Sequence, residues 1–250
     1  MKTSFSILHR SLVFLYGIAS YLVGMLSLAY AAGFIGDFLV PKSIDSPATT
    51  PFWQALLVNF GLLAVFALQH SIMARPAFKR WWTRIVPEVA ERSTYVLFSG
   101  LALILLFVFW QPMGGTIWQV TNLAGQAALY AMFASGWLLV VGTTLLINHF
   151  DLFGLRQVWL HLRGREYTPV EFKTPSLYKL VRHPLYAGLL LAFWAIPTMT
   201  VAHLVFALMT TAYILIAIRL EERDLIVQHP EYAAYRRRVP MLVPSPRRSA

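Results

Sequence analysis

Apolar stretches of about 20 residues recur along this chain, and they limit its fold more than any other feature. An α-helix needs roughly 20 apolar residues to cross the hydrocarbon core of a bilayer. Four such spans are expected, at residues 11–38, 52–74, 94–110 and 123–147, and a longer apolar stretch covers residues 185–218. Only 13% of the residues are charged, against about 25% in soluble domains. The sequence therefore predicts an integral multi-pass membrane protein of the all-α class.

The first apolar stretch has some features of a cleavable signal. Lys2 and Arg10 precede it, and the tripeptide "AYA" at residues 29–31 resembles a cleavage site. The stretch is longer than the roughly 7–15 residues of a usual signal core. We therefore expect it to be a membrane span.

Pro197 lies inside the last apolar stretch, which is therefore either one kinked helix or a hairpin that turns near "IPTMT". The segments before, between and after the apolar stretches carry 2, 1, 5, 0, 6 and 7 Lys or Arg residues in chain order. A hairpin places 20 of the 21 on one side of the membrane, and positive residues favour the cytoplasm. The prediction is a polytopic helical bundle of four spans plus a C-terminal helical hairpin, with both termini cytoplasmic.

The same topology explains the net charge of +10 through contact with anionic lipids, so the lipid bilayer is an expected partner and nucleic acid is not. No feature indicates a protein partner. We expect a single domain over residues 1–250, with a four-span part at 1–150 and a hairpin and cytoplasmic tail at 151–250. The tail region opens with an amphipathic segment, expected on the cytoplasmic surface, whose apolar residues are Leu152, Leu155, Val158, Trp159 and Leu162.

Metal and cysteine chemistry find no support in the sequence. Cysteine is absent, which excludes disulfides, thiolate metal sites and cysteine nucleophiles. The seven histidines show no close paired spacing of the kind that metal ligands need, so no metal site is predicted.

The stretch "LYKLVRHPLYAGLLLAFW" places polar residues at the start of the hairpin. Pro184 favours the first position of a helix and biases His183 towards extended backbone, so Arg182 and His183 are expected at a helix N-terminus. The helix dipole and the Arg182 charge favour an anionic ligand there. Tyr186 shares the face of His183, and Gly188 leaves room for a neighbouring helix or a ligand. The alternative is an ordinary positive flank with small-residue helix packing.

Acidic residues lie at the other end of the hairpin, and they are expected at a helix C-terminus or just past it: Glu221, Glu222 and Asp224. The dipole favours cations at that end, so these acids need a partner. Arg219 and Arg223 could supply it by ordinary pairing, and so could a ligand. Because both hairpin ends face the cytoplasm, they could meet around one molecule that offers a carboxylate to Arg182 and an ammonium, sulfonium or ribose to Glu222.

Three motifs together resemble a family. "RHPLYAG", "EERDL" and "PEYAAYRRRVP", within residues 177–240, are similar to the signature of the membrane methyltransferases related to isoprenylcysteine carboxyl methyltransferase. "NHFDLFGLRQVW" and the four-span half resemble the nurim-like branch, in particular its bacterial methanethiol S-methyltransferase family. His229 and Pro230 replace a turn that often contains Gly in the prenyl-cysteine enzymes. The resemblance implies an enzyme of the bacterial inner membrane that uses S-adenosyl-L-methionine to methylate a small volatile thiol, with methanethiol giving dimethyl sulfide.

Residue roles follow from the resemblance. It implies a cofactor site formed by Arg182, His183, Tyr186, Gly188 and Glu222, with further candidates at Glu221, Tyr232, Tyr235 and Arg236. The thiol must lose a proton, and His149 is the first candidate for the catalytic base, with Arg156 as a source of positive field. His70 and Gln69, at the end of the second span, are weaker candidates for the same pocket.

Other functions stay open from sequence. The acceptor could be another small thiol, hydrogen sulfide, an isoprenylcysteine or a phospholipid. A non-catalytic nurim-like membrane protein would share the fold. A transporter would need ionisable residues at mid-membrane, and the spans offer only Asp37 near the end of the first and His203 near the hairpin turn.

Overall fold

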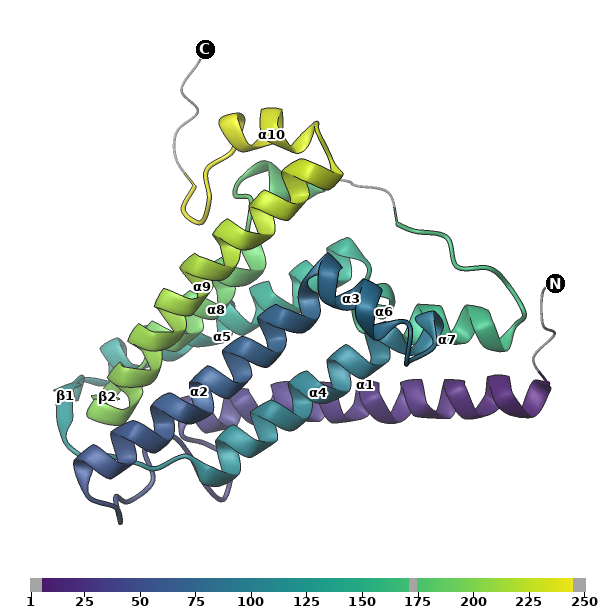
Figure 1. The fold of residues 1–250 in the computed structure, drawn as a ribbon. Coiled ribbons are helices and arrows are strands. Elements are labelled where there is room, and N and C mark those ends of the chain that lie inside the picture. The colour runs from purple at the N-terminus through teal and green to yellow at the C-terminus, as the bar shows by residue number, and fades with distance from the viewer. Residues whose placement is uncertain (1–5, 171–174, 245–250) are drawn as a thin grey trace. The chain divides into compact units, whose positions relative to one another are not determined.

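The computed structural model describes residues 6–170 and 175–244 and is almost entirely helical (Figure 1). The helices are α1 (Ile7–Gly36), α2 (Phe52–Ala74), α3 (Pro76–Trp82), α4 (Glu88–Phe109), α5 (Leu123–Ile147), α6 (His149–Leu152), α7 (Leu155–Leu162), the 3-10 helix η1 (Ser176–Lys179), α8 (Pro184–Trp194), α9 (Val201–Gln228) and α10 (Tyr232–Arg238). Two short strands are present, β1 (Thr116–Gln119) and β2 (Thr198–Thr200). Among the described helices, α1, α2, α4, α5 and α9 are long and apolar enough to cross a membrane. The predicted all-α membrane class is confirmed.

The chain forms two compact units, and neither is continuous in sequence. The first unit contains residues 1–112 and 148–170, and the second contains residues 113–147 and 171–250. α6 and α7 therefore return to the first unit after α5 has begun the second.

The four predicted spans all appear as helices. The bounds of α2 and α5 match the prediction, whereas α4 begins at Glu88 rather than at residue 94. The earlier start has a local cause, because Pro87 precedes the helix and its first turn carries Glu88 and Glu91, which the helix dipole favours. α1 ends where Asp37 adopts the left-handed conformation and its backbone N–H caps the carbonyl of Gly33. Asp37 is thus a helix cap.

In the first unit, α1 and α2 pack on α4, and the amphipathic helix α7 packs on α1 and α4. Val158 of α7 is fully buried against Gly17 of α1, where any added Cβ would lie 2.5 Å from a Val158 methyl group. Gly154 joins α6 to α7 at φ 86°, a value that favours glycine, and a Cβ there would lie 2.7 Å from the backbone nitrogen of Ser93. The apolar face of α7 is therefore buried against protein.

The second unit contains the hairpin, and its turn lies at the predicted place. Its arms are unequal, since α8 has 11 residues and α9 has 28. At 1.5 Å per residue α8 rises only about 16 Å, well short of the roughly 30 Å of a bilayer core. Residues 195–200 are largely extended and complete the first arm. The first arm of the hairpin therefore consists of α8 followed by a stretch of extended chain.

Extended backbone at this depth needs hydrogen-bond partners, because lipid supplies none. β1 provides them by pairing antiparallel with β2, and Val120 N donates to the Pro197 carbonyl at 2.9 Å. Trp118 Nε1 donates to the Ile196 carbonyl at 3.3 Å. His203 is fully buried, with Nε2 3.0 Å from the Phe193 carbonyl. His203 therefore closes the hairpin turn, a structural role that the transporter hypothesis does not require.

The acidic end of the hairpin corrects one prediction. Glu221, Glu222 and Asp224 were expected at a helix C-terminus or beyond it, but α9 continues to Gln228. The segment that follows Glu222 contains no helix breaker, and the first stop signal is Pro230, which disfavours helical backbone at His229. The acids therefore lie on the side of a continuous helix.

Candidate functional site

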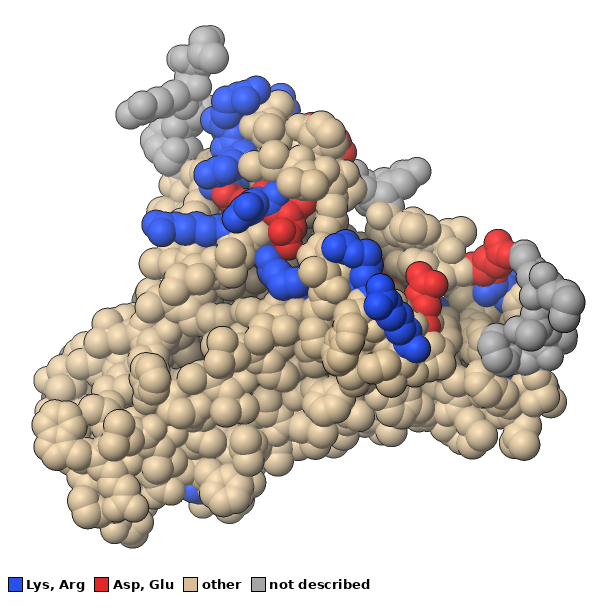
Figure 2. Space-filling view, in the orientation of Figure 1, with Lys and Arg blue, Asp and Glu red and all other residues tan. Residues whose placement is uncertain are grey.

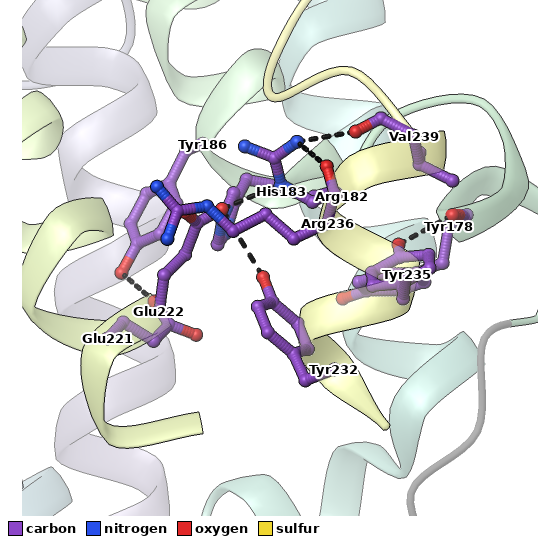
Figure 3. Close-up of polar contacts among 10 residues, drawn as sticks. All are labelled: Tyr178, Arg182, His183, Tyr186, Glu221, Glu222, Tyr232, Tyr235, Arg236 and Val239. Carbon is purple, nitrogen blue, oxygen red and sulfur yellow. Dashed lines mark hydrogen bonds and ion pairs between the residues drawn. The ribbon is translucent and has the colours of Figure 1, made fainter. Parts of the chain in front are cut away.

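Glu222 is the centre of a buried ion cluster in the second unit (Figure 3). One carboxylate oxygen lies 2.7 Å from Arg182 Nε and 3.0 Å from His183 Nε2, and the other lies 3.0 Å from Arg236 Nε. The Tyr232 hydroxyl donates to the first oxygen at 3.4 Å. Glu222 is only 3% exposed, so this carboxylate depends on its cations for stability. The two hairpin ends meet, as expected, and Arg182 pairs directly with Glu222.

The tail of the chain positions Arg182 and His183. Their backbone N–H groups donate to the carbonyls of Pro240 at 2.9 Å and Met241 at 3.1 Å, which holds both residues in non-helical backbone before α8 begins at Pro184. Arg182 Nη1 also donates to the carbonyl oxygens of Arg236, at 3.0 Å, and Val239. A single guanidinium therefore ties the start of α8, the side of α9 and the end of α10 together.

Glu221 is the less committed of the two acids. Its carboxylate accepts a hydrogen bond of 3.0 Å from the Tyr186 hydroxyl, and it has no other hydrogen bond or ion pair within residues 6–170 and 175–244. The side chain is half-buried. Glu221 therefore keeps acceptor capacity that Glu222 has already used.

Two tyrosines complete the cluster from α10. Tyr235 donates to the Tyr178 carbonyl at 2.6 Å, and its ring lies 5.5 Å from that of Tyr232. Burial raises the pKa of Tyr235 to about 12, and burial followed by the Glu222 charge raises the pKa of Tyr232. Both hydroxyls are therefore protonated donors at neutral pH.

Gly188 is placed against a neighbouring helix. An added Cβ would lie 2.7 Å from the Gly136 carbonyl oxygen and 3.1 Å from a Val140 methyl group, both in α5. Gly136 meets Gly188 in the same way, with the Gly188 carbonyl 2.7 Å from its would-be Cβ. Close helix packing accounts for this glycine, and a role in cofactor binding stays a prediction.

The cluster carries both signs of charge. Figure 2 shows Lys and Arg side chains gathered with acidic ones over α10 and the end of α9. The guanidiniums of Arg182 and Arg236 suit a carboxylate, and Glu221 suits an ammonium or hydroxyl group. The donor and acceptor set therefore fits the amino-acid end of a zwitterionic molecule.

His149, the predicted base, belongs to the first unit. Its Nε2 is 2.8 Å from the Tyr21 hydroxyl, and its ring centre lies 4.9 Å from that of Phe153. Burial lowers the pKa of His149 below its usual value. The imidazole is therefore neutral at pH 7 and able to accept a proton.

The Arg156 guanidinium is held by contacts with residues near it in the first unit. Its Nη1 lies 2.9 Å from the Asp151 carboxylate and donates to the Thr168 carbonyl at 2.8 Å, while Nη2 donates to the Thr168 hydroxyl at 2.8 Å. The guanidinium also lies 5.3 Å above the Tyr167 ring. We call these four residues the Asp151 clasp, and it binds the extended segment after α7 to α6. The Asp151 charge offsets the positive field that was predicted for Arg156.

His70 forms a buried polar contact between α2 and α4. Its ring nitrogens lie 2.8 Å from the Tyr95 hydroxyl and 3.0 Å from the Ser99 hydroxyl, and Gln69 donates to the Met73 sulfur at 3.1 Å. Sequence reasoning missed Tyr95 and Ser99, and it missed the tail carbonyls that hold Arg182. For the tail carbonyls, the signal in the sequence was the Val239-Pro240 pair that ends the tail motif.

Curated relatives match nearly the whole chain. Methanethiol S-methyltransferase of Crocosphaera subtropica is 58% identical over 240 residues, which cover 96% of this chain and 94% of that protein. Its namesake in Mycobacterium tuberculosis is 52% identical over 240 residues, with 96% and 98% covered. Nurim of Xenopus laevis is 34% identical over 184 residues, with 70% and 64% covered. No protein-family model matches the chain, and no solved structure is significantly similar to it.

Proposed function

Because the chain belongs to the methanethiol S-methyltransferase family, we propose that it methylates methanethiol to dimethyl sulfide with S-adenosyl-L-methionine as the methyl donor. One structural observation carries the cofactor part of this proposal, namely the Glu222 cluster with its paired charges of both signs. Family membership supports the reaction, and the cluster supports where the donor binds.

The cluster offers a partner for each polar group of that donor. Arg182 and Arg236 would hold its carboxylate, and Glu221 would receive the ammonium, because Glu221 has spare acceptor capacity. Glu222 fixes the orientation of both guanidiniums and of His183. The hydroxyls of Tyr186 and Tyr232 fix the two acids in turn. The donor supplies an activated methyl group, so the protein mainly has to orient the reactants and exclude water.

The thiol proton requires a base, and we assign this role to His149. Its neutral imidazole, hydrogen-bonded to Tyr21, is the form that accepts a proton. Arg156 acts as a positioning residue, because it holds Asp151, which lies in the same short helix as His149. The distribution of Lys and Arg supports an inner-membrane topology with both termini in the cytoplasm.

A headspace assay tests the proposal. The purified protein in detergent receives S-adenosyl-L-methionine and methanethiol, and dimethyl sulfide is measured by gas chromatography for the wild type, Glu222→Ala and Glu231→Ala. Glu231 is an exposed carboxylate of the same tail, so its variant is the matched control. We expect product from the wild type and the control and almost none from Glu222→Ala. Equal product from all three proteins would exclude the Glu222 cluster as the binding site of the methyl donor.

Nurim supplies a second candidate function, because a relative of that name is 34% identical to this chain. A non-catalytic membrane protein would bind no donor. A calorimetric titration with S-adenosyl-L-methionine separates the two. Binding without product would keep the methyltransferase class and point to other acceptors, such as hydrogen sulfide, an isoprenylcysteine or a phospholipid. Absence of both binding and product would favour the non-catalytic function.

A further inference from the structure

The short helix α3 carries a half-buried cation, Lys79, that no ion pair within the described residues neutralises. The Lys79 ammonium is half-buried, and it makes no hydrogen bond or ion pair with any residue in the described part of the chain. The positive charges of Arg92 and Arg75 act on it, opposed by Glu91. A half-buried ammonium in such company is destabilised, and burial together with those two cations lowers the pKa of Lys79. An anion bound beside Lys79 would offset this repulsion and the cost of burying its charge.

A second unsatisfied donor lies on the same helix. The indole Nε1 of Trp82 is buried and has no hydrogen-bond partner among the described residues. Lys79 and Trp82 are three residues apart, so their side chains share one side of the helix. Arg75 is the extended residue just before α3, and its Nε donates to the Ser71 carbonyl at 3.2 Å. Arg80 and Arg84, by contrast, are exposed. Figure 2 shows a row of Lys and Arg side chains over α3. Donors and charges on this side therefore point to one anionic group.

The surroundings identify the kind of anion. α3 directly follows the candidate span α2, and it carries a cluster of aromatic rings in which Phe78 stacks on Trp82 at 5.7 Å. Trp81 is 49% exposed and Ile85 is 65% exposed. Aromatic rings beside cations at the end of a span are typical of the headgroup level of a bilayer, and basic pockets between helices at that level bind anionic headgroups.

We propose that Lys79 and Trp82 form a binding site for the phosphate of an anionic phospholipid, with the acyl chains along the apolar faces of α2 and α4. Arg75 and Arg92 add positive charge beside this site, while Arg92 Nε donates to the Leu152 carbonyl at 2.7 Å. Lys79 pairs with the phosphate oxygens, and Trp82 Nε1 donates one hydrogen bond to them. The net positive charge of the site, after Glu91 is counted, matches a phosphodiester and does not favour the zwitterionic phosphatidylcholine headgroup.

Native mass spectrometry tests the site. The purified protein is equilibrated with equal amounts of phosphatidylglycerol and phosphatidylcholine of the same acyl chains, and retained lipid is counted for each variant. We expect the wild type to retain phosphatidylglycerol preferentially and Lys79→Gln to lose about fivefold of that preference, which is the value of one cation near an anionic membrane surface. Arg80→Gln removes an equal charge from the exposed side of α3 and should keep the preference.

Trp82→Phe removes the indole N–H and the second ring but keeps an aromatic side chain and every charge, so it tests the site even where Lys79→Gln does not fold, and it should also reduce the preference. An unchanged preference in Lys79→Gln and Trp82→Phe would overturn the proposal, as would an equal loss in Arg80→Gln, because a diffuse basic surface would then suffice. Displacement of phosphatidylglycerol by an equal concentration of inorganic phosphate would also overturn it, since the ligand would then be a free anion.

Discussion

The Glu222 cluster and the Asp151 clasp are both built from an acid held by arginine, yet they differ in burial and in reach. Glu222 is almost fully buried and collects Arg182 and His183 from 40 and 39 residues away in sequence, together with Arg236 from the tail. The clasp lies within residues 151–168, and the side chain of Arg156 is 27% exposed. A buried charge is costly to leave unpaired, whereas a partly exposed one is rescued by water. The cluster should therefore be the more sensitive of the two.

Removing the central charge should have the largest effect. Glu222→Gln keeps the size of the side chain but leaves Arg182 and Arg236 close together without their counter-charge and removes the carboxylate beside His183. We expect the loss of about 3 kcal/mol in the free energy of unfolding and of nearly all dimethyl sulfide production. Thermal unfolding in detergent and the headspace assay measure the two losses. Unchanged stability would show that the cluster is less tightly coupled than its geometry indicates.

His149 tests whether the first unit contributes chemistry as well as structure. Since burial lowers the pKa of this imidazole, its neutral form prevails above a midpoint lower than the usual 6.5. We expect the wild-type rate to rise with pH through that midpoint, and His149→Gln to lose about 100-fold in kcat together with this acid limb. A variant that retains the limb would assign the base to another residue.

Gly188→Ala tests how far the cluster depends on helix packing. The new Cβ would meet the Gly136 carbonyl and push α8, with Arg182 and His183 at its start, away from α5. We expect a loss of about 1–3 kcal/mol in the free energy of unfolding and weaker donor binding. Gly142→Ala is the matched control, because a Cβ there meets nothing within 4 Å. Equal effects of the two substitutions on donor binding would contradict the packing argument.

Arg156→Lys should have the smallest effect. Lysine keeps the charge and loses the two-nitrogen fork that grips Asp151 and Thr168. We expect about 1 kcal/mol less stability and a severalfold lower rate, with the same values for Arg156→Gln. Full activity in the lysine variant and low activity in the glutamine variant would restore the predicted role of Arg156 as a source of positive field.

Local sequence patterns predicted the parts of the fold that depend on hydrophobic length. α2 and α5 coincide with their apolar stretches, and Pro197 together with the distribution of Lys and Arg predicted the hairpin turn. The same topology argument predicted that Arg182 and Glu222 would approach each other, although it left a ligand between them.

The remaining features depend on contacts that a local pattern does not contain. The pairing of β1 with β2, the short α8 and the grip of the tail carbonyls on Arg182 all join distant segments. Arg156 was given a catalytic role because the position of Thr168 could not be read from its spacing. The length of α9 was underestimated because charge, which does not stop a helix, was read as the end of a span.

The pairing of β1 with β2 also sets an order of events during synthesis. Trp118 is synthesised 78 residues before Ile196, the residue whose carbonyl accepts its indole hydrogen bond. β1 therefore has no pairing partner while α5, α6, α7 and α8 are being synthesised. Contacts between such distant segments form late. Until the turn is made, the backbone donors and acceptors of β1 lack the partners that β2 and Pro197 supply in the folded protein.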